Sequence, residues 1–369
     1  MRAIVVEKGE IASLRLQRLI IQLLHTIFFK LVLMDASEAT KNALSCVLKA
    51  KDGDSIAIFC DRGKMDIGEA FTNGALELGL KTRLVPLKTE ESVFRKEIPS
   101  NVMQIISKQP PDIYVNLLRG IREETVFRVQ LIKMETEGHK SRLGHCPGVT
   151  MDMLTEGALA LKTSEHRKMQ RFAHNLMRKL GQATRVKITN PLGTNVSLNV
   201  KGRPFFTDTI VDEKTNKWMN LPTGEVIVAP IEDGMEGLLV CDMAVGGVGL
   251  VKNPITFTSK NGKVVDVASK DKTMLSRVKD SLQTDEKSSI VGEFAFGINP
   301  KARFVGEFLE AEKIMGTIHV AFGNNSDFPG GQNPSKNHLD VLVSKPTVKV
   351  FKEDGSTMEV LKNGTFQLE

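Results

Sequence analysis

The chain has 369 residues, 41% hydrophobic and 25% charged, which is the composition of a globular protein with about two domains and a sizeable core in each. Its 50 basic and 44 acidic residues are mostly interspersed, and it has a single Trp and a single Tyr, so neither a basic patch nor a base-stacking surface for nucleic acid is indicated. Four cysteines without a Cys-x-x-Cys pair argue against a thiolate zinc module and suit a reducing compartment, so we expect the cytoplasm.

Residues 1–33 contain the most apolar stretch of the chain, residues 19–29. That stretch is interrupted by polar residues and is shorter than the roughly 20 residues of a membrane-spanning helix, so we expect no membrane association. Glu7 and Glu10 are not typical of the basic leader of a signal peptide. We therefore expect an accessory packing helix here, and Met34 leaves open that the core fold begins after it.

From residue 34 to residue 183, helical and strand periodicities alternate. Strands are predicted at residues 55–60, 82–87 and 112–118, and helices after Asp35 or Ser37 and at residues 68–78 and 123–134. This alternation indicates an α/β domain with a doubly wound, mostly parallel sheet. Residues 61–64 follow the first strand, where such sheets bind ligands, but they lack the glycine spacing of a phosphate loop. We interpret them as a structural turn.

A loop over residues 141–148 precedes helices predicted between residues 151 and 180. Within this loop His145 is a candidate catalytic residue of a cleft, and Arg142 could hold an anionic group. Cys146 lacks an orienting partner for a role as thiol nucleophile. His166 and His174 lie among Lys and Arg in the helical region, which predicts a solvated face.

Residues 184–369 read as a second, strand-rich α+β domain. Short alternating strands broken by Gly, Asn and Pro are predicted at residues 184–189, 195–201, 225–229, 237–242, 255–259 and 263–268. The glycine-rich run at residues 244–249 resembles a nucleotide loop, but no helix follows it. We interpret this run as a hairpin turn.

The carboxyl-terminal part of this domain contains candidate metal ligands. His319 lies in an apolar alternation that ends at a Gly-Asn-Asn turn, so it should project from a strand. His338 and Asp340 are two residues apart, and the period of a strand directs both to the same face. Two imidazoles and a carboxylate on rigid strands form a three-ligand set for a divalent transition metal and leave positions for water or substrate.

Two glutamates could extend this set. Glu225 opens a strand directly after a Pro-Gly loop, and Glu293 lies in an otherwise apolar strand. A carboxylate in apolar surroundings is costly unless a cation or a donor satisfies it, which a metal ion would do. The alternative for each is a surface-facing glutamate on a half-exposed strand.

These residues occur in an order that resembles a known family, the thermophilic metallo-aminopeptidases typified by aminopeptidases T and S, which are leucyl aminopeptidase-like. The matching motifs run from about Met34 onward and include Asn220-Leu-Pro-Thr-Gly-Glu225, Gly292-Glu293, Gly316-Thr-Ile-His319-Val-Ala-Phe-Gly323 and Asn333-x-Ser335-x-x-His338-x-Asp340.

The resemblance implies a metal-dependent aminopeptidase that acts on peptides, usually as a homodimer, with two divalent ions such as Zn, Co or Mn in each chain. It implies that either of two carboxylates, Glu225 or Glu293, orients the attacking water. The metal ligands that it implies are Glu225, Glu293, His319, His338 and Asp340.

One departure from the family pattern leaves alternatives open. The family has a tyrosine a few residues after the first metal-binding histidine, whereas residues 323–328 here contain none. Ser326 or Asp327 could replace it, or the site holds one ion. The loop around His145 and the Phe-Gly-Asn-Asn turn also resemble the dihydroxypyridine dioxygenases, in which two His and one Asp hold a single Fe(II). A ring-cleaving dioxygenase is therefore the alternative function, and a binding protein with a degraded site is a third.

Overall fold

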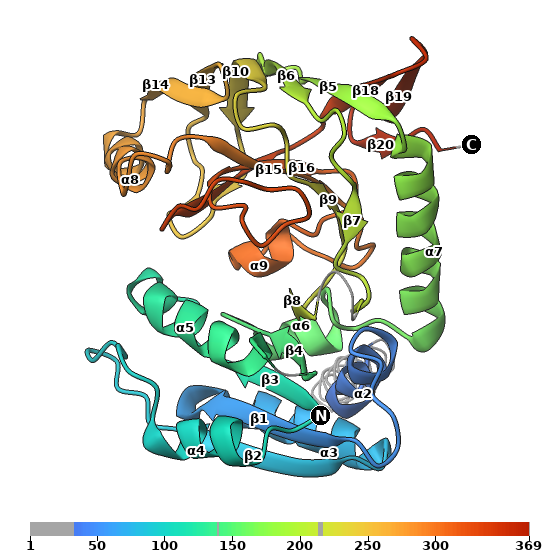
Figure 1. Ribbon diagram of the computed structural model, residues 1–369, viewed down its shortest axis with the longest axis vertical. Coiled ribbons are helices and arrows are strands. Elements are labelled where there is room, and N and C mark those ends of the chain that lie inside the picture. The colour runs from blue at the N-terminus through green and yellow to red at the C-terminus, as the bar shows by residue number, and fades with distance from the viewer. Residues whose placement is uncertain (1–32, 139, 213–216, 369) are drawn as a thin grey trace, which may run out of the picture.

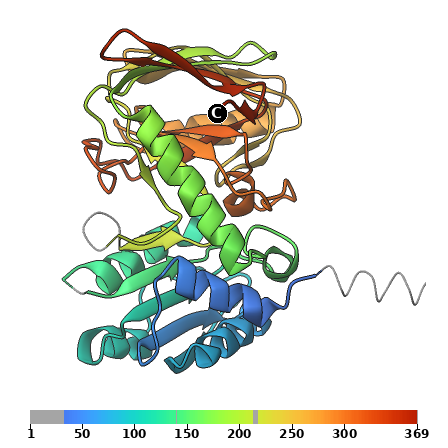
Figure 2. The same cartoon turned by 90° about the vertical axis from the view of Figure 1, so that its right-hand side faces the viewer.

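The computed structural model describes residues 33–138, 140–212 and 217–368. The accessory helix predicted over residues 1–33 therefore falls, except for Leu33, outside the described residues. Two lobes are visible: the amino-terminal lobe contains a five-stranded sheet, and the carboxyl-terminal lobe contains sheets of eight and seven strands (Figure 1). Helix α7 (Thr163–Leu180) extends from one lobe to the other along one side of the molecule (Figure 2). Among the described residues, no helix is both long and apolar enough to cross a membrane.

The amino-terminal lobe has the predicted α/β architecture, with all five strands parallel in the order β2-β1-β3-β4-β8. Strand β1 (Ser55–Asp61) is buried on both faces, because Ile56 and Ile58 pack into one hydrophobic cluster while Ala57 and Phe59 pack into another. The other elements are β2 (Lys81–Leu87), β3 (Ile113–Leu117), β4 (Arg142–His145), β8 (Trp218–Asn220), α2 (Ala36–Cys46), α3 (Met65–Glu77), α4 (Ser100–Lys108), α5 (Thr125–Thr136), α6 (Met151–Thr155) and the 3-10 turns η1 (Arg62–Lys64) and η2 (Arg122–Glu124).

Of the two residues after which the first helix was predicted to begin, Asp35 is the one that caps it. The Asp35 carboxylate accepts hydrogen bonds from the backbone N–H groups of Ser37 and Glu38, which satisfies two donors that the first helical turn leaves free. Helix α2 therefore begins at Ala36.

Two predictions for this part of the chain are wrong. Residues 142–145 form strand β4 and not a loop, because they pair with β3 on one side and with β8 on the other. His166 is buried and not solvated: its residue exposure is 1%, and burial lowers its pKa to about 4. The helical period of α7 directs the His166 side chain toward the core, although its sequence neighbours are charged. His174 is exposed, as predicted.

The carboxyl-terminal lobe consists of two antiparallel sheets around a shared hydrophobic core, to which α7 also contributes. Phe257 of the larger sheet stacks on Phe322 of the smaller one, with 5.7 Å between the ring centroids. The larger sheet has the order β14-β13-β10-β6-β5-β18-β19-β20 and comprises β5 (Ala183–Thr189), β6 (Asn195–Asn199), β10 (Met235–Cys241), β13 (Ile255–Lys260), β14 (Lys263–Ser269), β18 (Thr347–Lys352), β19 (Thr357–Lys362) and β20 (Thr365–Phe366).

The smaller sheet has the order β12-β11-β17-β16-β15-β9-β7. It comprises β7 (Phe206–Thr207), β9 (Glu225–Val228), β11 (Ala244–Val245), β12 (Gly249–Leu250), β15 (Val291–Gly297), β16 (Ile318–Gly323) and β17 (His338–Val343), with helices α8 (Lys272–Leu282) and α9 (Phe308–Ala311) beside the sheets. Strands β11 and β12 pair with each other, so the glycine-rich run is the predicted hairpin.

The chain crosses between the two lobes more than once. Strand β8 lies in the parallel sheet, although it follows β5, β6 and β7 in the sequence, and the chain then returns to the carboxyl-terminal lobe through β9. The backbone N–H of Leu221 donates to the carbonyl of His145 over 2.8 Å, which fixes this crossing. The domain boundary between residues 183 and 184 therefore stays a prediction, and one strand from beyond it, β8, belongs to the parallel sheet of the amino-terminal lobe.

Candidate metal centre

The five candidate ligands from the sequence come from four neighbouring strands of the smaller sheet, in the order β17-β16-β15-β9. Glu293 on β15 is opposite Ala321 on β16, which is opposite Asp340 on β17. His319, two residues before Ala321, has its side chain on the same face of the sheet. The intervening position on that face is Ala321, so little side-chain volume separates the polar groups.

Their polar atoms lie close together. The Nε2 atom of His319 is 3.2 Å from Glu293 Oε1, 3.6 Å from a carboxylate oxygen of Glu225 and 4.0 Å from Asp340 Oδ1. The Nε2 atom of His338 is 3.1 Å from Glu293 Oε2 and 3.2 Å from Asp340 Oδ1. Glu293 thus lies between the two imidazoles, and the structure brings all five predicted residues into one cluster.

The burial of the two glutamates excludes the alternative that they face the surface. Glu225 and Glu293 are each 4% exposed, so neither is a surface residue on a half-exposed strand. His319 is equally buried, whereas the side chain of His338 is 34% exposed. The cluster is therefore closed on the side of the core and exposed to solvent at His338.

The carboxylates favour positive charge at the centre of the cluster. Burial opposes protonation of His319, but Glu225, Glu293 and Asp340 outweigh it and raise the pKa of this imidazole to about 10. Burial likewise opposes ionisation of Glu293, but the two histidines outweigh it and hold its pKa well below the usual range. A divalent cation among these groups would meet the same electrostatic preference.

Three further charged residues of the cluster were not identified from the sequence. Glu312 and Lys313 follow the short helix α9, which lies on the side of the lobe that faces the parallel sheet (Figure 1), and Asp208 follows β7. All three are at most 7% exposed. Charged residues in a loop normally indicate a solvated surface, so the sequence contains no periodic signal of their burial.

The donor atoms fit a divalent transition metal. Two sets of three residues, Glu293-His319-Asp340 and Glu225-Glu312-His319, each place one nitrogen and two oxygens within 4.8 Å of one another. Among the described residues, Glu225 Oε1 is buried without a hydrogen-bond partner, as a ligand atom would be. The other ring nitrogen of His338 is 2.9 Å from the Asn324 carbonyl, a contact that orients a metal-binding imidazole.

The structure places His145 apart from this cluster. It ends β4 in the parallel sheet, opposite Asn116 and Asn220, and it is 4% exposed. Burial, reinforced by the charge of Arg128, lowers its pKa to about 3. The ring is thus buried and neutral inside the amino-terminal lobe, and a catalytic role for His145 stays a prediction.

Other candidates of the amino-terminal lobe have structural contacts. Arg142 forms a 2.7 Å ion pair with Asp54 and donates to the carbonyl of Leu48, so it binds protein groups and not an external anion. Cys146 is buried, and burial raises the pKa of its thiol, which disfavours the nucleophilic thiolate. Residues 62–64 form the turn η1, as predicted.

The loop that lacks the family's tyrosine forms its own hydrogen bonds. The Ser326 hydroxyl donates to the Asn324 side chain over 2.8 Å, and Asp327 accepts a 3.4 Å hydrogen bond from the same residue. Phe328 packs edge-on against the His338 ring, with 6.1 Å between centroids. Ser326 and Asp327 are exposed and are engaged within the turn.

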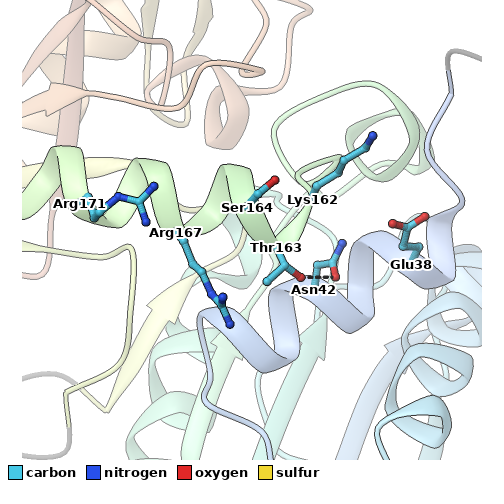
Figure 3. Close-up of a pocket in the computed structure, with 7 residues that line it drawn as sticks. All are labelled: Glu38, Asn42, Lys162, Thr163, Ser164, Arg167 and Arg171. Carbon is cyan, nitrogen blue, oxygen red and sulfur yellow. Dashed lines mark hydrogen bonds between the residues drawn. The ribbon is translucent and has the colours of Figure 1, made fainter.

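A pocket of about 590 Å³ lies elsewhere, where α2 meets the beginning of α7 (Figure 3). Asn42 and Thr163 are joined there by a 3.0 Å hydrogen bond, and Arg167 and Arg171 contribute basic groups. None of the candidate metal ligands lines this pocket.

The fold and the cluster together define a class: a two-lobed metalloprotein with an α/β lobe and a β-rich lobe that contains histidine and carboxylate donors. The particular family follows from the sequence match of residues 161–366, and the chain belongs to the thermophilic metalloproteases (M29). This match confirms the family resemblance of the motifs, and membership implies a divalent metal.

The relatives agree with this assignment. The aminopeptidase AmpS of Bacillus subtilis (strain 168) is 25% identical over 177 residues, which span 42% of each chain and thus less than half of that relative's length. Wild-type AmpT from Thermus thermophilus has a similar structure, with a TM-score of 0.69, 17% identity and coverage of 90% of this chain and 98% of that one.

A second similar structure is that of 2,5-dihydroxypyridine dioxygenase from Pseudomonas putida KT2440, with a TM-score of 0.63, 16% identity and coverage of 90% of this chain and 96% of that one. At these identities the two structures establish the fold, which is the predicted α/β lobe followed by a strand-rich lobe. Because a fold can support unrelated chemistries, the activity must be argued from the site.

Proposed function

We propose that the protein is a metal-dependent aminopeptidase that hydrolyses the N-terminal residue of peptides. The observation that carries this proposal is the convergence of Glu225, Glu293, His319, His338 and Asp340 in one cluster, which is largely buried and is exposed at His338. Family membership, the AmpS relative and the fold shared with AmpT support it.

The residues of the cluster suit hydrolysis. A divalent ion bound there would polarise the scissile carbonyl and lower the pKa of water. Glu225 or Glu293 would orient that water and accept its proton, and Glu225 Oε1 has no hydrogen-bond partner among the described residues. The excess of carboxylates also provides a partner for the free α-ammonium group that distinguishes the start of a peptide.

The resemblance implies two divalent ions of Zn, Co or Mn in each chain. Because Lys313 contacts both Glu225 and Glu312, we propose full occupancy only for the set that contains Glu293, His319 and Asp340. We also propose a cytoplasmic homodimer: the homodimer rests on the family resemblance and the compartment on four cysteines that are all unpaired.

A second candidate function is ring cleavage by a non-haem Fe(II) dioxygenase acting on a dihydroxypyridine-like aromatic. The observation that favours it is the pair of imidazoles with one aspartate, His319, His338 and Asp340, which is a ligand set typical of such enzymes. The loop without a tyrosine is compatible with it. Hydrolysis remains our choice because Glu225 and Glu293 add two buried carboxylates, which can orient a water molecule and accept its proton.

The deciding experiment compares a short peptide with its N-acetylated twin under argon, with Zn²⁺, Co²⁺ or Mn²⁺ added after treatment with a chelator. We expect cleavage of the free-amine peptide alone, loss of activity with the chelator and recovery with the metal. His338→Ala should be inactive, and His174→Ala, at an exposed histidine, is the matched control.

Equal cleavage of both peptides would contradict an aminopeptidase. Cleavage of neither, together with oxygen uptake on a dihydroxypyridine in the presence of Fe(II) and air, would instead establish the dioxygenase.

A further inference from the structure

Lys313 places a positive charge inside the metal-centre cluster. Its side chain is 2% exposed, and its ammonium group donates a short hydrogen bond to Glu225, lies 2.9 Å from Glu312 Oε1 and lies 3.7 Å from Asp208 Oδ2. These three carboxylates are themselves at most 9% exposed at the side chain. The ammonium therefore occupies a buried, acidic position that a metal ion would also favour.

This position coincides with one of the two possible ligand sets. Glu225 and Glu312 are two of the three residues in the set completed by His319, and both already contact the ammonium. A second divalent ion at that set would have to displace Lys313 or share its ligands with a like charge. The set of Glu293, His319 and Asp340 is not engaged in this way, because none of the three is in the ion pairs described for Lys313.

The backbone holds Lys313 in this orientation. Its N–H donates to the carbonyl of Glu310 over 3.1 Å, and its carbonyl accepts from the N–H of Asn299 over 2.9 Å. Glu310 is fully buried and paired with Arg303, and the Asn299 side chain donates to the carbonyls of Ala158 and Thr223. The loop is thus fixed on both sides of the lysine.

We propose that the centre holds one divalent ion per chain, bound by Glu293, His319, His338 and Asp340, and that the ammonium of Lys313 takes the place of a second cation. This inference rests on the metal centre of the proposed function and specifies how many ions it holds. Lys313 is then a positioning residue: it holds one oxygen of Glu225 and leaves the other directed toward His319, beside the ion.

The test is the number of ions bound per chain. Purified full-length protein is stripped with a chelator, titrated with Zn²⁺ or Mn²⁺ in a calorimeter, and analysed for metal after dialysis. We expect one ion in the wild-type chain, one in Lys313→Arg and two in Lys313→Gln, which removes the charge from the second set. Lys349→Gln, at a surface lysine paired with Glu359, is the control and should bind one.

The outcomes separate this inference from the proposed function. Two ions in the wild-type chain would overturn the role of Lys313 while leaving a metal-dependent enzyme. One ion in both the wild type and a folded Lys313→Gln variant would also overturn it, because the charge would not limit the number. Absence of binding in the wild type would contradict the metal centre itself. A count of two ions in the wild type overturns the inference even if Lys313→Gln does not fold.

Discussion

Two clusters of buried charge differ in how their charges are matched. In the amino-terminal lobe, Asp61 and Glu124 meet Arg95 and Arg119 at the carboxyl ends of β1 and β3, and we call these four residues the paired network. Arg95 contacts both carboxylates, and the backbone N–H of Arg119 donates to Asp61 over 2.8 Å. Two negative groups thus face two positive groups.

The metal-centre cluster lacks this balance. Its five carboxylates, from Asp208, Glu225, Glu293, Glu312 and Asp340, face the single ammonium of Lys313 and two imidazoles. Buried charges are tolerated when they are paired, so an excess of one sign indicates a group that arrives from outside. The paired network fills the edge where α/β sheets commonly bind ligands, and the unmatched cluster is the functional site that we propose.

The largest expected effect follows from removing a donor of the unmatched cluster. His338→Ala should lower peptidase activity by more than about 100-fold, because a direct ligand should contribute at least as much as the outer contacts that orient one. Metal should also no longer raise the thermal midpoint of unfolding, since that stabilisation requires binding to the folded state. Metal analysis and a melting curve with and without Zn²⁺ measure both effects. Wild-type metal content in the variant would place the site elsewhere.

Breaking the paired network should affect stability and not metal binding. Glu124→Gln leaves Arg95 and Arg119 partly unpaired in a buried setting, and we expect the free energy of unfolding to fall by roughly 3–5 kcal/mol. Urea unfolding measures this change. Glu123→Gln, at the adjacent exposed residue, should be nearly neutral. Loss of bound metal from a folded Glu124→Gln variant would show that the two clusters are not independent.

Stability should depend on pH through His166, a buried imidazole whose ring nitrogens have no hydrogen-bond partner among the described residues. Burial lowers the pKa of His166 to about 4, so the folded state keeps this ring neutral while the unfolded state takes up a proton below about pH 6.5. The unfolded state therefore binds more protons between these values, and His166 should account for a loss of about 2 kcal/mol of stability from pH 7 to pH 5.

The measurement is urea unfolding of the wild type and of His166→Leu at about pH 7 and about pH 5. The variant should lose less stability on acidification, while His174→Leu, at the exposed histidine, should behave like the wild type. Equal acid sensitivity of the wild type and His166→Leu would contradict the assignment.

The smallest expected effect concerns the loop that precedes His338. Asp285 accepts hydrogen bonds from the Ser335 hydroxyl at 2.9 Å and from the backbone N–H of Lys336 at 2.6 Å, and these contacts lower its pKa to about 2. Asp285→Asn should weaken metal binding by roughly 3- to 10-fold, less than the loss of a contact made directly to a ligand. Calorimetry measures the change, with Glu286→Gln as the exposed control. An unchanged affinity would mean that the loop is held without Asp285.

The sequence predicted the features that depend on local periodicity. A short apolar run indicated β1, alternation around His319 indicated β16, and the two-residue spacing of His338 and Asp340 placed them on one face, where the structure has them. Strand β8 was missed because three residues contain too little pattern and its partner β4 is more than 70 residues earlier. Lys313 was missed because only the tertiary fold decides that a charged loop turns inward.

The crossing of the chain between lobes has a consequence for cooperativity. Glu225 begins β9 only five residues after β8 ends in the other lobe, and the Leu221 hydrogen bond to His145 ties the connection to the parallel sheet. A fragment that starts at residue 184 would contain all five candidate ligands. It would lack strands β1 to β4 of the parallel sheet, to which the connection before Glu225 is anchored. The two lobes should therefore melt as a single unit, and an enzyme assembled by fusing the carboxyl-terminal half to a foreign partner should have its first carboxylate misplaced.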